Sequence, residues 1–88
     1  MPELARFFGI IVRMYFADTD RHHQAHVHVE ADGDKAAVAL DGTVLAGRLP
    51  PKKLTVLQAW LFLHEDELHT AWEKAANHEI PGTIRPLA

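Results

Sequence analysis

The chain contains no cysteine among its 88 residues. Disulfide frameworks, thiolate zinc sites and cysteine nucleophiles are therefore excluded, and any metal ion would need nitrogen and oxygen ligands. The chain also lacks an apolar run of roughly 20 residues, the length that crosses a bilayer. Its longest apolar stretches, such as residues 7–12 and 59–63, are far shorter, and Glu3 disfavours a signal peptide. We therefore expect one cytoplasmic domain over residues 1–88 without a membrane partner.

Positive charge is also scarce, whereas histidine is abundant. Nine Lys and Arg side chains stand against twelve Asp and Glu, which gives a formal net charge of −3 when the seven histidines are neutral. The chain as a whole lacks the excess of positive charge that is typical of nucleic-acid-binding proteins, so only a local patch would bind such a partner. Because imidazole titrates in mild acid, the sign of the net charge depends on pH.

Alternation of apolar and polar residues predicts four strands in the first half of the chain. The sequence Asp41-Gly42 between the last two favours a two-residue type I′ turn, in which both central residues have positive φ. In the third strand Ala37 and Ala39 would face outward and leave a shallow surface, which is either a floor for a ligand or simply small side chains without a role. The expected strands are residues 7–16, 25–31, 35–40 and 43–49.

An apolar period of 3.6 residues from Leu54 onward predicts one long helix, with a kink near His64. Thr55 and Gln58 fit a capping box, so the regular helix is expected to begin at Thr55. The first half of the helix carries a second set of apolar residues, Val56, Trp60 and Leu63. We therefore expect this half to be buried against the sheet.

The fold class is therefore predicted as α+β, a small antiparallel four-stranded sheet with the long helix on one face and a short C-terminal extended segment. That segment covers residues 83–87, and a homo-oligomer could form there by strand pairing, although Pro86 argues against a long pairing.

Four of the seven histidines fall within seven residues, at the junction of a loop and the second expected strand. Strand alternation places His26 and His28 on one outward face together with Glu30. His22 or His23 from the preceding loop would add a third nitrogen, so the metal-site hypothesis is His22, His26 and His28. Zinc, nickel, manganese or iron would suit such ligands, with Glu30, Asp18 or Asp20 supplying a carboxylate.

The same histidines suit a second chemistry, because a neutral-pH imidazole both accepts and donates a proton. His26 and His28 flanking a phosphodiester would run metal-free, ribonuclease-type transfer. Arg13, Arg21 or Lys35 would then hold the phosphate or contact a partner. A third interpretation is structural, in which exposed histidines only make a pH-sensitive protein contact.

The remaining histidines and the two tryptophans have structural explanations. His64, His69 and His78 lie five and nine residues apart, spacings that do not converge on one ligand along a helix. We expect His69 and His78 at the surface and His64 partly buried. Trp60 and Trp72 are expected to pack the helix against the sheet.

Several segments together resemble a small prokaryotic family, domain of unknown function 4160. They are residues 6–16, beginning Arg-Phe-Phe-Gly-Ile, the histidine segment, residues 47–50, the helix with Trp60, Leu63 and His64, and residues 84–87. Members carry the segment His-x-Pro-Pro-His-Phe-His, onto which His22, His26 and His28 map. His23 falls outside that pattern, and Gln24, Ala25 and Val27 replace its prolines and phenylalanine.

The resemblance implies a component of a toxin–antitoxin-like module, with a small partner protein encoded nearby and nucleic acid as a further partner. Our leading hypothesis is such a module protein with a histidine surface, whether or not it is an enzyme. The alternatives are a non-catalytic metal-binding module, for zinc or nickel, and a structural interaction domain.

Overall fold

The structure is a computed structural model that describes residues 3–15 and 24–87. Within these residues five antiparallel strands pair in chain order to form one sheet. Two helices follow, α1 (Pro51–Leu63) and α2 (Glu65–Ala76). The α+β class is confirmed, but the expected four strands and single long helix are wrong. The strands are β1 (Glu3–Phe7), β2 (Ile10–Arg13), β3 (His26–Ala31), β4 (Asp34–Ala39) and β5 (Val44–Gly47).

The extra strand arises because the chain turns within the first expected strand. Phe8 and Gly9 have positive φ angles of 48° and 74° and join β1 to β2, so that Phe7 pairs with Ile10. The turn contains no polar residue, and phenylalanine rarely adopts positive φ. The apolar alternation therefore predicted one continuous strand across the turn. The Lys53 ammonium of α1 donates a hydrogen bond to the Phe8 carbonyl and anchors the turn.

The hairpin between β4 and β5 lies where Asp41-Gly42 placed it, but the turn type differs from the prediction. Of these two residues only Gly42 has positive φ, 96°. The Asp41 carboxylate instead accepts a hydrogen bond from the Thr43 backbone N–H at 2.9 Å, which holds Asp41 at negative φ. This bond also lowers the pKa of Asp41 below its ordinary value.

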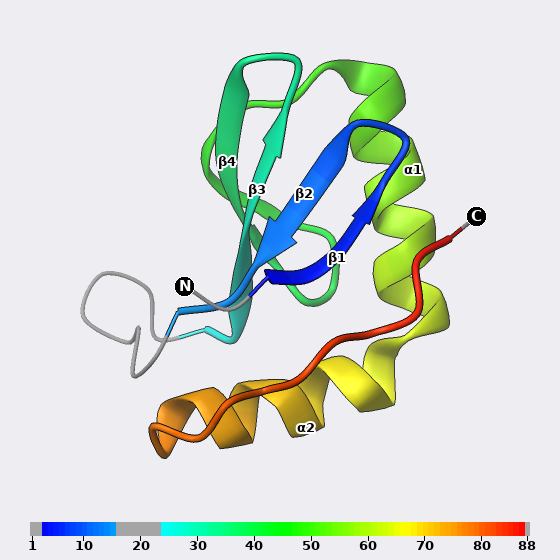
Figure 1. Cartoon of the computed structure of the whole chain (residues 1–88). Helices are drawn as coiled ribbons and strands as arrows, with labels where there is room; N and C mark the ends of the chain where they lie inside the picture. The colour runs from blue at the N-terminus through cyan, green and yellow to red at the C-terminus, as the bar shows by residue number, and fades with distance from the viewer. Residues whose placement is uncertain (1–2, 16–23, 88) are drawn as a thin grey trace.

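Helix α1 begins four residues before the expected start. Pro51 occupies its first position, where proline's fixed φ suits a helix and its missing N–H is not needed. The Thr55 hydroxyl donates to the Pro51 carbonyl at 3.1 Å, as in a helix interior, so the predicted capping box is wrong. The kink predicted near His64 is a full break between α1 and α2, and Figure 1 shows the two helices running in different directions.

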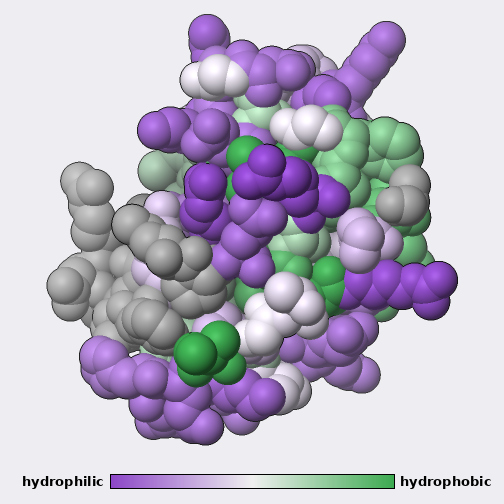
Figure 2. Space-filling model, in the orientation of Figure 1, coloured by the Kyte–Doolittle hydropathy of each residue, from purple (hydrophilic) through white to green (hydrophobic). Residues whose placement is uncertain are grey.

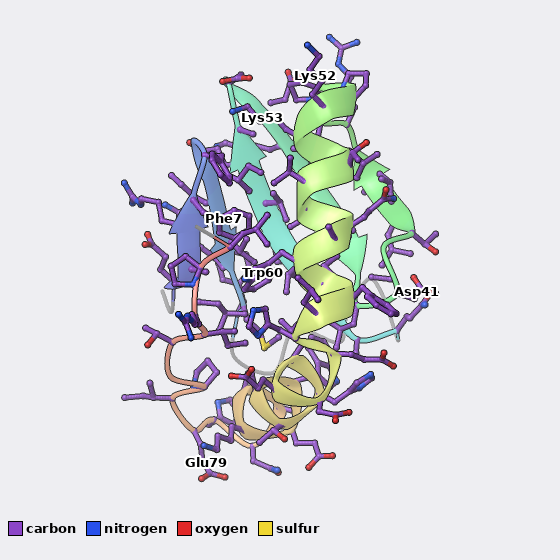
Figure 3. All side chains as sticks on the ribbon, turned by 90° about the vertical axis from the view of Figure 1, so that its right-hand side faces the viewer. Phe7, Asp41, Lys52, Lys53, Trp60 and Glu79 are labelled. Atoms are coloured by element: carbon purple, nitrogen blue, oxygen red, sulfur yellow. The ribbon has the colours of Figure 1, made fainter. Side chains whose placement is uncertain are left out.

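Helix α1 covers one face of the sheet, and the main core lies between them. Figure 3 shows Phe7 and Trp60 in this layer, with Lys52 and Lys53 at the start of the helix. The Phe7 and Trp60 rings are 5.3 Å apart, and Trp60 is fully buried. Leu63 does not join the core as expected, because 63% of it is exposed. The strands contribute alternate residues to the core, including Ile10, Val12, Val27, Val29, Ala36 and Val38.

The chain after α2 returns to the beginning of the sheet and runs beside β1 (Figure 1). The Ile84 N–H donates to the Leu4 carbonyl at 2.8 Å, and the Arg85 carbonyl accepts the Trp60 indole N–H at 2.9 Å. This is the expected extended C-terminal segment at a sheet edge. Across the described ranges no helix has the length and apolar character needed to span a membrane.

Candidate functional site

The face of the sheet away from α1, here called the open face, carries the candidate site. Strand pairing aligns Arg13, His28, Ala37 and Ala46 in one row across β2, β3, β4 and β5. These residues alternate with the core residues of the same strands, so their side chains point away from α1. Figure 2 shows hydrophilic side chains gathered over the strands, with apolar patches between them.

A pocket of about 300 Å³ lies on the open face. Its floor includes the small residues Ala37, Ala46 and Gly47. The low alanine floor predicted beside the histidines is confirmed at Ala37 but is wrong at Ala39, which is fully buried and does not line the pocket. The polar and aromatic side chains that line the pocket are Arg13, Tyr15, His28, Glu30 and Lys35.

His28 is half-buried in the pocket and lies between two other rings. Its ring centroid is 4.3 Å from that of Tyr15 and 5.2 Å from that of His26. The contact with Tyr15 is tilted, and the contact with His26 is edge to face. These two neighbours restrict the orientation of the His28 ring while the pocket leaves it accessible to a ligand.

His26 lies on the face that alternation predicted, but its expected exposure is wrong. Only 1% of the residue is exposed. Its ring centroid is 5.1 Å from that of Trp72 in α2, which reaches the beginning of β3. The His26 Nδ1 lies 2.8 Å from the Gln24 carbonyl oxygen, and because a carbonyl only accepts, Nδ1 carries the proton. The sequence pattern could not show that a second helix would cover this end of the face.

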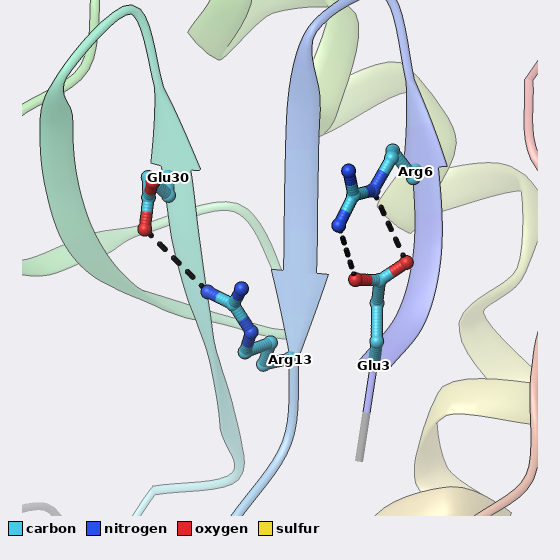
Figure 4. Close-up of polar contacts among 4 residues, drawn as sticks. All are labelled: Glu3, Arg6, Arg13 and Glu30. Atoms are coloured by element: carbon cyan, nitrogen blue, oxygen red, sulfur yellow. Dashed lines mark hydrogen bonds and ion pairs between the residues drawn. The ribbon is translucent and has the colours of Figure 1, made fainter. Parts of the chain in front are cut away.

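Opposite charges meet beside the pocket, as Figure 4 shows. A guanidinium nitrogen of Arg13 lies 3.5 Å from the Glu30 carboxylate, with both side chains about one-third exposed. In the register of β3 and β4, Glu30 lies opposite Lys35, which is exposed. Two of the three residues predicted for phosphate or partner binding, Arg13 and Lys35, line the same pocket as His28.

Other predicted site residues lie outside the described residues. These are Asp18, Asp20, Arg21, His22 and His23, all within residues 16–23. Among residues 3–15 and 24–87, no group of three or more carboxylate or imidazole side chains could hold a metal ion. The hypothesis of a metal site at His22, His26 and His28 therefore remains a prediction.

Sequence reasoning did not single out three residues that shape the pocket, Tyr15, Ala46 and Gly47. Tyr15 shares the alternation of Arg13, which was the available signal. Gly47 has a φ of 74°, and a Cβ atom there would lie 2.2 Å from the Lys35 carbonyl oxygen. This contact is impossible without a shift of the backbone, so glycine allows β5 to approach β4 at the pocket.

The remaining histidines lie where the sequence predicted. His64 has a side chain 16% exposed, with Nδ1 2.8 Å from a Glu67 carboxylate oxygen. His69 and His78 are exposed. Trp60 and Trp72 both pack against the core, as expected.

Comparison with known proteins gives a family but no described activity. No curated protein and no solved structure matches the chain. A family model described as a domain of unknown function (DUF4160) matches residues 9–73. The match runs from the turn between β1 and β2 into α2 and includes every residue that lines the pocket. The chain belongs to this family of domains of unknown function.

Proposed function

We propose that the open-face pocket binds RNA and that His28 is its acid–base group, within a toxin–antitoxin-like module. The observation that supports this proposal is the convergence of Arg13, His28 and Lys35, from three neighbouring strands, on one pocket. Two cations beside an imidazole suit a phosphodiester, because the cations balance its charge and the imidazole exchanges protons near neutral pH.

Each pocket residue has a separate role in this proposal. The Arg13 guanidinium offers two parallel donors to a phosphate, and Lys35 adds a compact charge at the rim. The small floor of Ala37 and Ala46 leaves room for a sugar or base above the sheet. Glu30 holds Arg13 when no anion is bound and competes with the phosphate for it.

The proposed reaction is intramolecular transfer at phosphorus. His28 takes the proton of a ribose 2′-hydroxyl as that oxygen forms a bond to phosphorus. The bond from phosphorus to the 5′-oxygen breaks, and this oxygen takes a proton from solvent, which leaves a cyclic phosphate. His28 then returns its proton to solvent. His26 was predicted as the second catalytic histidine, but its burial favours a positioning role through its contact with His28.

Binding of a fluorescently labelled single-stranded RNA, followed by anisotropy, tests the pocket. We expect Lys35→Ala to weaken binding about tenfold, and Glu30→Gln to strengthen it severalfold because Arg13 is released. Lys52→Ala is the matched control, because Lys52 is an exposed lysine at the start of α1 (Figure 3) that does not line the pocket. Equal losses in Lys35→Ala and Lys52→Ala would contradict a localised site.

Cleavage and growth test the role of His28. We expect His28→Ala to retain RNA binding within about threefold and to lose cleavage by a factor of about 100 or more. Expression of the wild-type chain should inhibit growth, and co-expression of the neighbouring gene's product should relieve this. If His28→Ala still cleaves RNA at the wild-type rate, the acid–base assignment is wrong.

A metal-binding module is the second candidate, because the His26 ring is oriented as metal-ligating imidazoles are. Its Nδ1–H donates to a backbone carbonyl, the usual outer contact of such a ligand. The third imidazole in this hypothesis is that of His22. We expect zinc or nickel to raise the unfolding temperature of the untagged protein and of His69→Ala, but not of His28→Ala. RNA binding that survives a chelator would separate this function from the first.

A further inference from the structure

The last turn of α1 exposes two large apolar side chains side by side. Phe62 is 76% exposed and Leu63 is 63% exposed, whereas Trp60 and Leu61 beside them are buried. Helix α1 is therefore apolar on its outer side at this end as well as on its core side. A helix that is apolar all round usually has a partner on each face. The sheet covers only one face of α1.

A hollow of about 410 Å³ adjoins these two side chains, where α1 meets α2. His64 fixes this joint, because its ring contacts Trp60 at 5.5 Å and its Nδ1 lies 2.8 Å from the Glu67 carboxylate. The first turn of α2 adds three consecutive acidic residues, Glu65 to Glu67, all exposed. We call Phe62, Leu63, Glu65 and Asp66 the joint patch.

Charge decides which occupant suits the joint patch. A second copy related by a two-fold axis would bring one acidic triplet against the other, and an anionic membrane surface would meet the same repulsion. A basic segment would meet opposite charge beside the two apolar side chains. We propose that the joint patch docks an amphipathic, basic helix of a partner protein, with its apolar side chains on Phe62 and Leu63.

This surface is independent of the proposed RNA pocket. The pocket lies on the face of the sheet away from α1, and none of its lining residues belongs to the joint patch. A partner on the joint patch and an anion in the pocket therefore use different residues. Failure of the RNA proposal leaves the docking proposal standing, and the reverse also holds.

Two labelled helical peptides test the proposal, both with leucine on one face and either lysine or glutamate on the other. We expect the lysine peptide to bind the wild-type protein and the glutamate peptide to bind at least about tenfold more weakly. The double variant Phe62→Ser with Leu63→Ser should lose about tenfold in affinity for the lysine peptide. Its circular dichroism spectrum should match that of the wild type, because both side chains are exposed.

Ile80→Ser is the matched control, since Ile80 is as exposed as Phe62, at 76%, but lies beyond α2. It should bind the lysine peptide as the wild type does. Glu65→Gln with Asp66→Asn should weaken binding severalfold and flatten its salt dependence, with Glu67 kept because it holds His64.

Three outcomes would overturn the proposal. The first is equal affinity of the lysine peptide for the wild type and the Phe62→Ser, Leu63→Ser variant. The second is equal affinity of the wild type for both peptides. The third is a wild-type dimer in analytical ultracentrifugation that this variant abolishes. That result would assign the joint patch to a second copy of the chain.

Discussion

The two faces of the sheet are built from the same strands, but one forms the hydrophobic core and the other carries the pocket. Toward α1, β3 and β4 present valine and alanine, packed around the fully buried Trp60. On the open face the same strands present His28, Glu30 and Lys35 over an alanine floor. The first face therefore buries apolar area and stabilises the fold, whereas the charged side chains of the open face remain in contact with solvent. Substitutions of the exposed residues of the open face should change binding without unfolding the protein.

The largest expected effect lies on the covered face, at Trp60. Trp60→Ala removes a buried ring that contacts Phe7 and leaves the Arg85 carbonyl without its indole donor. We expect the free energy of unfolding to fall by about 3–5 kcal/mol, measured by urea denaturation. The control is Lys35→Ala on the open face, which should change it by less than about 0.5 kcal/mol. Similar losses of free energy of unfolding in both variants would show that the two faces contribute equally to stability.

Gly47 affects both the stability of the sheet and the shape of the pocket, because its backbone lines the pocket and lies against β4. Gly47→Ala should lower the free energy of unfolding by about 2–3 kcal/mol, since the new Cβ atom meets the Lys35 carbonyl. Gly33→Ala is the control: Gly33 also has positive φ, 82°, but a Cβ atom there has nothing within 4 Å. It should cost only about 1 kcal/mol. Equal costs would show that φ alone requires glycine at position 47.

Ala46→Leu should separate binding from stability. The side chain at position 46 is exposed on the pocket floor, so leucine would fill the pocket without entering the core. We expect RNA affinity to fall about tenfold and the free energy of unfolding to change by less than about 0.5 kcal/mol. Ala76→Leu, at the exposed end of α2, should alter neither quantity. Unchanged RNA affinity in Ala46→Leu would place the RNA elsewhere.

The smallest effect is expected for the ion pair of Glu3 and Arg6 on β1, drawn in Figure 4. The hydrogen bond from Arg6 lowers the pKa of Glu3, so the pair stabilises the fold above the ordinary glutamate pKa. This contribution disappears as the pH falls through the lowered pKa. Wild type and Glu3→Gln should therefore differ slightly in urea midpoint at neutral pH and converge in acid. A difference that grows in acid would contradict this.

The alternation of side chains was predictable from the sequence because it depends on neighbouring residues alone. It placed Val27 and Val29 in the core, and His28 outward beside Ala37. Period-two alternation within residues 10–15 also places Arg13 and Tyr15 on one face, although only the pairing of β2 with β3 brings Arg13 opposite His28. Which residues line the pocket depends on this register between strands. The sequence pattern of a single strand does not determine the register.

Two errors occur where tertiary contacts override local preference. Phe8 tolerates positive φ in a turn whose carbonyl is held by Lys53, 45 residues later in the chain. His26 is buried rather than exposed because Trp72 of α2 covers it. Neither contact leaves a pattern within its own strand. The error at Thr55 is local, because Pro51 at the first helical position is itself a start signal in the sequence.

The hydrogen bond between Ile84 and Leu4 has a consequence for synthesis. The first strand emerges from the ribosome early, but its outer edge gains a partner only when residue 84 emerges. The indole N–H of Trp60 likewise meets its acceptor, the carbonyl of Arg85, only then. At translation rates of about 5–20 residues per second, β1 stays open along one side for several seconds. Chaperones that recognise unpaired strands have that interval in which to bind the nascent chain.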